Sequence, residues 1–130
     1  MEGEISRSLD GIKAVFLDLD GTIYLGDSLI DGALDFLGRL EERGIKRYFL
    51  SNNSSKSVEQ YVEKLRDLGI DADKEEVLLS THDLISWLSK KEVTSTFLVG
   101  TEGMRSMLEE EGIETSSGQP EFVVLGYDTE

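Results

Sequence analysis

The sequence predicts an α/β protein built on a doubly wound parallel sheet. Short apolar blocks that can form buried strands alternate with longer segments in which apolar residues recur every three or four positions. Three of the helical segments also end in the same dipeptide, Gly-Ile. Alternation at this spacing is typical of βαβ units, in which a helix leads the chain back to the next parallel strand.

Five apolar blocks are candidate strands. The first runs directly into two acidic residues, as is expected where a buried strand ends at the edge of a parallel sheet. The second is followed by a cluster of serine and asparagine residues. In chain order the predicted strands are Ala14–Leu17, Arg47–Leu50, Val77–Leu79, Thr96–Val99 and Phe122–Leu125.

Four helices are predicted between these strands, because each intervening segment presents one apolar face. The faces are formed by Leu34, Leu37 and Leu40; by Val58, Tyr61, Val62, Leu65 and Leu68; by Leu84, Ile85 and Leu88; and by Met104, Met107 and Leu108.

Local signals mark where these helices begin and end. A glycine can adopt the left-handed conformation that ends a helix, and a following apolar residue can pack back on the last turn. The pairs Ser57 with Gln60 and Ser80 with Asp83 resemble capping boxes. His82, the single histidine, lies at a predicted helix start, where we expect a surface or capping role. The predicted helix ends are Gly44-Ile45, Gly69-Ile70 and Gly112-Ile113.

Composition excludes several classes of function. The net charge is −14, from 27 acidic and 13 basic side chains, which argues against binding to nucleic acid or to an anionic membrane. A small phosphorylated ligand is still compatible with this charge, because a metal ion can screen it locally. There is no cysteine, no apolar run of membrane-spanning length, and no basic amino-terminal signal, so we expect a cytoplasmic protein.

The candidate site lies where the first two predicted strands end. Asp18 and Asp20 follow the first strand, and two carboxylates this close require a cation or a proton. Ser51 and Asn52 follow the second strand, and their hydroxyl, amide and backbone N–H groups suit an anion. If the two strands are adjacent and parallel, these groups share one edge of the sheet. Carboxylates suit Mg²⁺, which commonly also binds a substrate phosphate.

These residues resemble two motifs of a known family. Asp18-Leu19-Asp20-Gly21-Thr22-Ile23-Tyr24 is similar to the first motif of the haloacid dehalogenase (HAD) superfamily phosphatases, and Ser51-Asn52-Asn53 to the second. Gly100-Thr101 and the stretch Val124-Leu125-Gly126-Tyr127-Asp128 resemble the NagD and para-nitrophenyl phosphatase branch. The resemblance runs from about Ile12 onward and implies the Rossmann-like core of that superfamily.

The resemblance implies a role for each motif residue. Asp18 would be the nucleophile that forms an aspartyl-phosphate and would also bind Mg²⁺. Asp20 would protonate the leaving group and help to activate water, and its backbone carbonyl would supply a second metal ligand. Ser51 and Asn52 would bind the phosphoryl group, and Leu19 and Gly21 belong to the same substrate-binding set. The substrate would be a small phosphorylated metabolite.

The resemblance also implies parts without a counterpart here. Members of the branch have a cap domain, a later lysine and a later acidic pair, so residues 1–130 are expected to be the amino-terminal part of the core, without the cap and the later core strands. Weak or no activity is expected of such a portion. Two alternatives stay open: a response-receiver-like domain that accepts a phosphoryl group, and an inactive fragment that self-associates through an exposed sheet edge.

Overall fold

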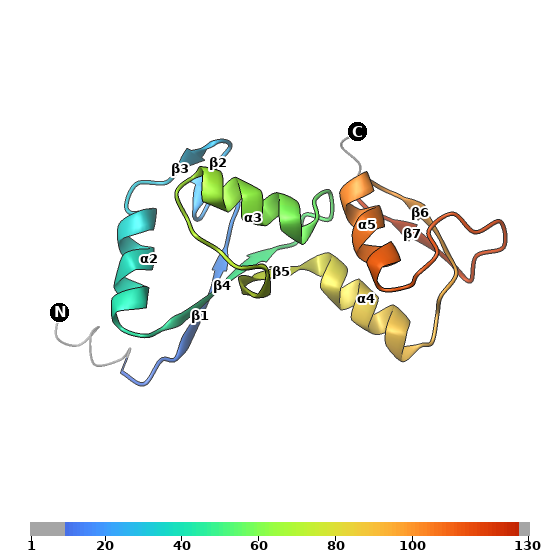
Figure 1. Ribbon diagram of the computed structural model, residues 1–130, viewed down its shortest axis with the longest axis horizontal. Coiled ribbons are helices and arrows are strands. Elements are labelled where there is room, and N and C mark those ends of the chain that lie inside the picture. The colour runs from blue at the N-terminus through green and yellow to red at the C-terminus, as the bar shows by residue number, and fades with distance from the viewer. Residues whose placement is uncertain (1–9, 128–130) are drawn as a thin grey trace. The chain divides into compact units, whose positions relative to one another are not determined.

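The computed structural model describes residues 10–127 and confirms the α/β class (Figure 1). The acidic amino terminus and Asp128, which contributed to the sequence interpretation, lie outside the described residues. The chain divides into two compact units, residues 1–49 and 50–130. Each unit is described by itself below.

The first unit contains a parallel strand pair and one helix. Strand β1 is Ala14–Asp18, and the strand next to it in the sheet is β4, Lys46–Ser51, whose last two residues belong to the second unit. The backbone N–H of Lys46 donates to the carbonyl of Lys13 at 2.9 Å. Because this bond joins the amino ends of the two strands, β1 and β4 run in the same direction, as the sequence predicts.

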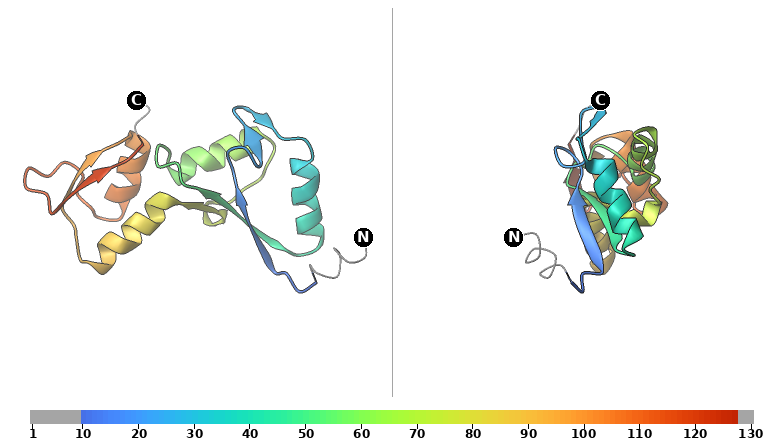
Figure 2. Two further views of the ribbon diagram at one scale, coloured as in Figure 1. Left: turned by 180° about the vertical axis from the view of Figure 1, so that it is seen from behind. Right: turned by 90° about the vertical axis from the view of Figure 1, so that its left-hand side faces the viewer.

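Between these strands the chain forms a small hairpin and then a helix. Strands β2 (Tyr24–Leu25) and β3 (Ser28–Leu29) pair in antiparallel fashion, and helix α2 spans Ala33–Glu42. Figure 2 shows α2 beside β1 in this unit. The core of this unit consists of Leu17, Leu19, Ile23, Tyr24, Ala33, Leu37, Leu40 and Phe49, which are buried. Of the predicted apolar face of α2, Leu37 and Leu40 are confirmed, whereas Leu34 is 48% exposed and Ala33 is buried instead.

The second unit contains the remaining helices and strands. They are α3 (Val58–Asp67), the 3₁₀ helix η1 (Lys74–Glu76), β5 (Val77–Leu79), α4 (Ser80–Lys90), β6 (Thr96–Val99), α5 (Glu102–Glu110) and β7 (Phe122–Leu125). Helix α3 packs against β5, and α4 packs against both β5 and α5. In the sheet that begins with β1, the strand order is β1-β4-β5.

Strands β6 and β7 form a separate parallel sheet, with Leu98 opposite Val124. The five predicted strands are therefore divided between two sheets. Side chains on one face of β6 and β7 join a local core with the two helices next to them in sequence. This core consists of Leu88, Val93, Leu98, Met104, Leu108, Ile113 and Val124, with Leu84 and Ile85 at its edge.

All three predicted Gly-Ile helix ends are confirmed. Gly44, Gly69 and Gly112 have φ values of +66°, +88° and +76°. In each case the N–H of the following isoleucine donates to a carbonyl in the last turn of the helix, at 2.8 to 3.1 Å. The left-handed glycine thus turns the chain so that the isoleucine returns to the helix it has just left.

One of the two predicted capping boxes is confirmed and the other is wrong. Ser57 caps α3, with its hydroxyl accepting from the N–H of Gln60 and its N–H donating to the Gln60 side chain. Helix α4 instead begins at Ser80 itself, and the N–H of Leu79 donates to Nδ1 of His82 at 2.9 Å. The capping role expected of His82 is therefore confirmed, whereas Ser80 and Asp83 do not form the box.

Among residues 10–127, none of the helices combines the length and the apolar character that crossing a membrane requires.

Candidate active site

The first half of the candidate site is the acidic turn that follows β1. Successive side chains of a strand point to opposite faces, so burial alternates along it. Leu17 and Leu19 are 9% and 0% exposed, whereas Asp18 and Asp20 are both exposed. The two leucines anchor the backbone in the core, whereas the side chains of Asp18, the last residue of β1, and of Asp20, in the turn, are exposed to solvent.

Backbone hydrogen bonds hold this turn in a tight form. The carbonyl of Leu19 accepts from the N–H groups of Thr22 and Ile23 at 3.1 and 3.0 Å, and the N–H of Gly21 donates to Tyr24 at 2.8 Å. Gly21 has φ of +83°, which side chains with a Cβ rarely adopt. The glycine after Asp20 is therefore required by the backbone of the turn, whatever ligand the turn binds.

The hairpin that follows the turn was not expected from the sequence. Its register pairs Tyr24 with Leu29 and Leu25 with Ser28, which leaves Gly26-Asp27 as a two-residue loop. A Gly-Asp dipeptide between short apolar segments is a hairpin signal that could have predicted it. The buried Tyr24 is shared by the turn and the hairpin, so the hairpin is fixed directly beside the carboxylates.

The second half of the candidate site is the loop between β4 and α3, residues 51–57, called the serine loop here. Ser51 is 6% exposed and Asn52 is exposed. The N–H of Asn53 donates to Oγ of Ser51 at 3.1 Å, and the N–H of Ser55 donates to Oδ1 of Asn53 at 2.9 Å. Each side chain thus accepts from the backbone two residues further on, which folds the loop back on itself.

Two further side chains contact the start of the serine loop. The hydroxyl of Tyr61, on α3, lies 2.9 Å from Oγ of Ser51, and this pair is buried. The hydroxyl of Ser80 donates to the carbonyl of Asn52 at 3.2 Å. The Ser51 hydroxyl is therefore bound by α3 and the Asn52 carbonyl by the start of α4, while the Asn52 side chain is exposed.

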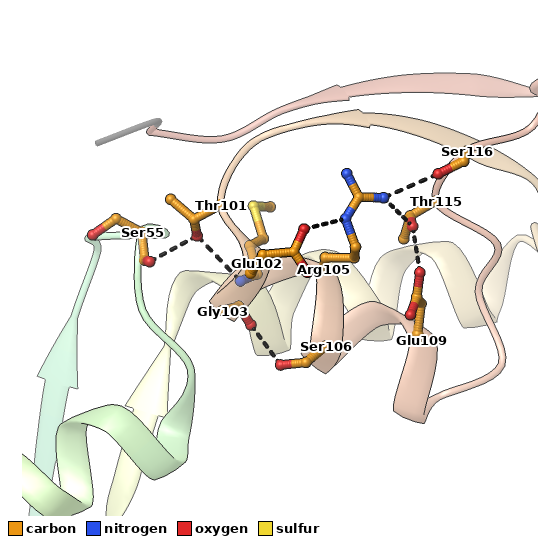
Figure 3. A network of polar contacts seen from close by, with 10 residues as sticks. Ser55, Thr101, Glu102, Gly103, Arg105, Ser106, Glu109, Thr115 and Ser116 are labelled. Carbon is orange, nitrogen blue, oxygen red and sulfur yellow. Dashed lines mark hydrogen bonds and ion pairs between the residues drawn. The ribbon is translucent and has the colours of Figure 1, made fainter. Parts of the chain in front are cut away.

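The end of the serine loop is bound to the β6–α5–β7 segment of the same unit. Thr101 is fully buried, and its hydroxyl donates to the carbonyl of Ser55 at 2.7 Å while accepting from the N–H of Met104 (Figure 3). The N–H of Tyr127 donates to the hydroxyl of Ser54 at 2.8 Å. Gly103 lies so close to α3 that an added Cβ would be 2.9 Å from the Ser57 nitrogen.

A second polar network on α5 orders the loop beyond that helix. Arg105 donates to the hydroxyls of Thr115 and Ser116 at 2.7 and 3.0 Å, and its Nε donates to Glu102 (Figure 3). Thr115 in turn donates to Glu109. This network fixes residues 114–117 beside β6, and it does not include any residue of the serine loop.

The structure places the predicted site residues in two sets. Asp18, Leu19, Asp20 and Gly21 lie at the end of β1 and in the turn of the first unit, and Ser51 and Asn52 lie near the start of the second unit. In residues 10–127 there is no group of three or more His, Cys, Asp or Glu side chains arranged to hold a metal ion. A cavity of about 520 Å³ in the first unit contains neither carboxylate and is lined by Ile12, Val15, Phe36, Arg39, Leu40, Arg43 and Ile45.

Comparison with known proteins bears on both sets. The sequence model of haloacid dehalogenase-like hydrolases matches residues 15–114, which include the acidic turn and the serine loop. The acid sugar phosphatase of Staphylococcus aureus is 38% identical over 118 residues, or 89% of this chain and 46% of the relative. The chain thus spans about half the length of the curated relatives it matches.

Solved structures show the same relationship. The 4-nitrophenylphosphatase of Thermotoga maritima is 38% identical, with a TM-score of 0.87 over 93% of this chain and 47% of that one. A glycerol phosphate phosphatase of Mycobacterium tuberculosis, solved in complex with magnesium, is 25% identical. Its TM-score is 0.82, over 91% of this chain and 37% of that one.

Proposed function

Because this chain belongs to the haloacid dehalogenase-like hydrolases, in their NagD and para-nitrophenyl phosphatase branch, we propose that it carries the nucleophile and phosphate-binding loop of a phosphatase. The reaction would be hydrolysis of a small phosphate monoester through an aspartyl-phosphate. The observation that carries the proposal is the acidic turn, where Asp18 and Asp20 are exposed while the neighbouring Leu17 and Leu19 are buried.

The two carboxylates divide the chemistry. In the first step, a carboxylate oxygen of Asp18 bonds to phosphorus, the bond from phosphorus to the ester oxygen breaks, and Asp20 gives its proton to that oxygen. In the second step, Asp20 takes a proton from water, whose oxygen attacks phosphorus and releases phosphate and the Asp18 carboxylate. Covalent catalysis replaces one difficult displacement by two easier ones, and one acid–base group serves both.

The serine loop would bind the phosphoryl oxygens. Ser51 has a hydroxyl and Asn52 an exposed amide, and both can donate to an anion. The loop leads directly into the amino end of α3, where backbone N–H groups and the helix dipole favour negative charge. In the acidic turn, Leu19 and Gly21 flank Asp20, so we place their backbone at the border of the same phosphoryl group.

The donors in the acidic turn suit Mg²⁺, which usually takes one or two carboxylates and completes its octahedral shell with water and substrate phosphate. The carboxylate of Asp18 and the backbone carbonyl of Asp20 would hold it, which leaves the Asp20 side chain free for proton transfer. The ion would supply positive charge that offsets the repulsion between the Asp18 carboxylate and the phosphate dianion. The similar phosphatase solved with magnesium supports this choice of metal.

Phosphate release from 4-nitrophenyl phosphate tests the proposal, in the whole protein that carries this sequence and with MgCl₂ present. Asp18→Asn keeps the size of the side chain and removes the nucleophile, so we expect turnover to be lost. Asp27→Asn, in the loop of the β2–β3 hairpin, is the matched control and should retain turnover. Turnover by Asp18→Asn equal to that of the unaltered protein would overturn the assignment.

The family match favours a phosphatase over a receiver domain, whose acceptor aspartate would follow the third strand. Self-association through a sheet edge stays a prediction, and light scattering of the purified protein would test it.

A further inference from the structure

The contact between Ser51 and Tyr61 is a buried hydroxyl pair behind the serine loop. The two oxygens are 2.9 Å apart, and the residues are 6% and 1% exposed. Ser51 also accepts a hydrogen bond from the backbone of Asn53 at 3.1 Å. The direction of the Ser51–Tyr61 bond therefore decides what Ser51 can still offer to a ligand.

A serine hydroxyl has one proton and two acceptor lone pairs. The N–H of Asn53 can only donate, so it occupies one lone pair of Ser51 permanently. If Ser51 donates to Tyr61, its single proton is used inside the protein. If Tyr61 donates to Ser51, both lone pairs are occupied and the proton of Ser51 is directed to a third partner.

We infer that Tyr61 is a positioning residue that donates to Ser51 and so directs the Ser51 proton to a bound phosphoryl oxygen. This inference rests on the proposed function. An unprotonated phosphoryl oxygen can only accept from Ser51, so binding through such an oxygen selects this direction. The resulting chain, from Tyr61 through Ser51 to phosphate, is strengthened because consecutive hydrogen bonds polarise one another.

Two features at the start of α3 support this role of Tyr61, one by fixing the helix and one by strengthening the donor. The helix begins at a complete capping box, formed by Ser57 and Gln60 immediately before Tyr61 in the sequence. Nζ of Lys56 lies 5.7 Å from the centre of the Tyr61 ring. A positive charge at the ring stabilises electron density on the phenol oxygen and therefore makes its O–H a stronger donor.

Tyr61→Phe, which removes only the hydroxyl, tests the inference. The measurement is the affinity of the whole protein for inorganic phosphate, determined by calorimetry in the presence of Mg²⁺. Loss of one hydrogen bond behind the ligand should weaken binding about tenfold. Ser51→Ala should weaken binding at least as much, and adding Tyr61→Phe to Ser51→Ala should cost nothing more, because Tyr61 acts through Ser51. Tyr48→Phe, on β4, is the matched control and should bind as the unaltered protein does.

A second measurement gives the direction of the bond without deleting it. Replacing Tyr61 with 3-fluorotyrosine makes the phenol more acidic, hence a better donor and a poorer acceptor, at almost unchanged size. Tighter phosphate binding is expected if Tyr61 donates, and unchanged or weaker binding would overturn the inference. This replacement also covers the case in which Tyr61→Phe does not fold.

The outcomes separate the inference from the proposed function. Phosphate affinity unchanged by Tyr61→Phe but reduced by Ser51→Ala overturns the role of Tyr61 and leaves that of Ser51. Additive effects of the two substitutions also overturn it. If neither substitution changes the affinity, or the unaltered protein does not bind phosphate, the role of Ser51 itself is wrong. Full turnover by Asp18→Asn would instead reject the phosphatase chemistry.

Discussion

Gly103→Ala should destabilise the protein, although alanine is normally the better residue in a helix. Gly103 lies in the first turn of α5, and glycine inside a helix usually costs about 0.5–1 kcal/mol relative to alanine. At this position the new Cβ would overlap Oε1 of Gln60 and would be 2.9 Å from the backbone nitrogen of Ser57. Ordinary contacts of a Cβ begin at 3.4 Å. The Gln60 side chain must leave the capping box, and because the Ser57 nitrogen is backbone, α5 must also move away from the start of α3.

The free-energy cost of both adjustments can be compared with the helix-propensity gain of replacing glycine by alanine. Losing the 2.8 Å bond from the Ser57 N–H to Gln60 costs about 1 kcal/mol, and overpacking costs ~1–3 kcal/mol. After the helix-propensity gain is subtracted, Gly103→Ala should lower the free energy of unfolding by ~1–3 kcal/mol. Gly38→Ala is the matched control, because Gly38 lies within α2 and an added Cβ would meet no atom within 4 Å. That variant should instead gain ~0.5–1 kcal/mol.

Urea unfolding of the 130-residue chain measures both changes. The single tryptophan, Trp87, lies on α4 in the same unit as Gly103, so its fluorescence reports on that unit. Far-UV circular dichroism follows both units and therefore also detects Gly38→Ala. The reasoning is refuted if Gly103→Ala stabilises the chain as Gly38→Ala does, because α5 would then not contact the capping box as closely as described.

Two other predictions follow from polar contacts. Thr101→Val keeps the shape of the buried side chain but leaves the Ser55 carbonyl and the Met104 N–H without their partner, so the free energy of unfolding should fall by ~2–3 kcal/mol. Thr101→Ser keeps the hydroxyl and should lower the free energy of unfolding by only about 1 kcal/mol. Equal losses in the two variants would contradict the role of the hydroxyl. The hydrogen bond from Lys74 lowers the pKa of Glu59 below its ordinary value of 4.5, so the pair stabilises the fold above pH 4.5 and loses its effect as pH falls through the lowered pKa. The thermal unfolding temperature of Glu59→Gln should therefore approach that of the unaltered chain on acidification. A difference in unfolding temperature that grows on acidification would contradict the assignment.

Local patterns in the sequence predicted most elements correctly. Every predicted strand is present, with small extensions of the first two to Asp18 and to Lys46–Ser51. The Gly-Ile helix ends are also correct, because both the left-handed turn and the returning apolar residue are encoded within two adjacent positions. The capping box at Ser57 could likewise be predicted, since its two partners are three residues apart.

Contacts between distant residues could not be predicted in the same way. The hydroxyl of Thr101 donates to Ser55, 46 residues earlier, and no local pattern identifies that partner. Ser80 has the residue type of a helix cap, yet its hydroxyl binds the carbonyl of Asn52 and His82 takes over the capping bond. The aspartates and Ser51 could be selected as candidate site residues, whereas the position of Tyr61 behind Ser51 required the fold.

The alternation of exposed and buried side chains at the end of β1, from Phe16 through Leu17 to Asp18, limits how this segment can change during evolution. Inserting or deleting one residue between Ala14 and Asp18 would exchange the two faces of the strand from that point onward. Asp18 would then face the core, and Leu17, which anchors the end of the strand, would face water. Inserting or deleting two residues would return each side chain to its original face of the strand. In this strand, length variation that preserves the acidic turn is therefore restricted to even steps.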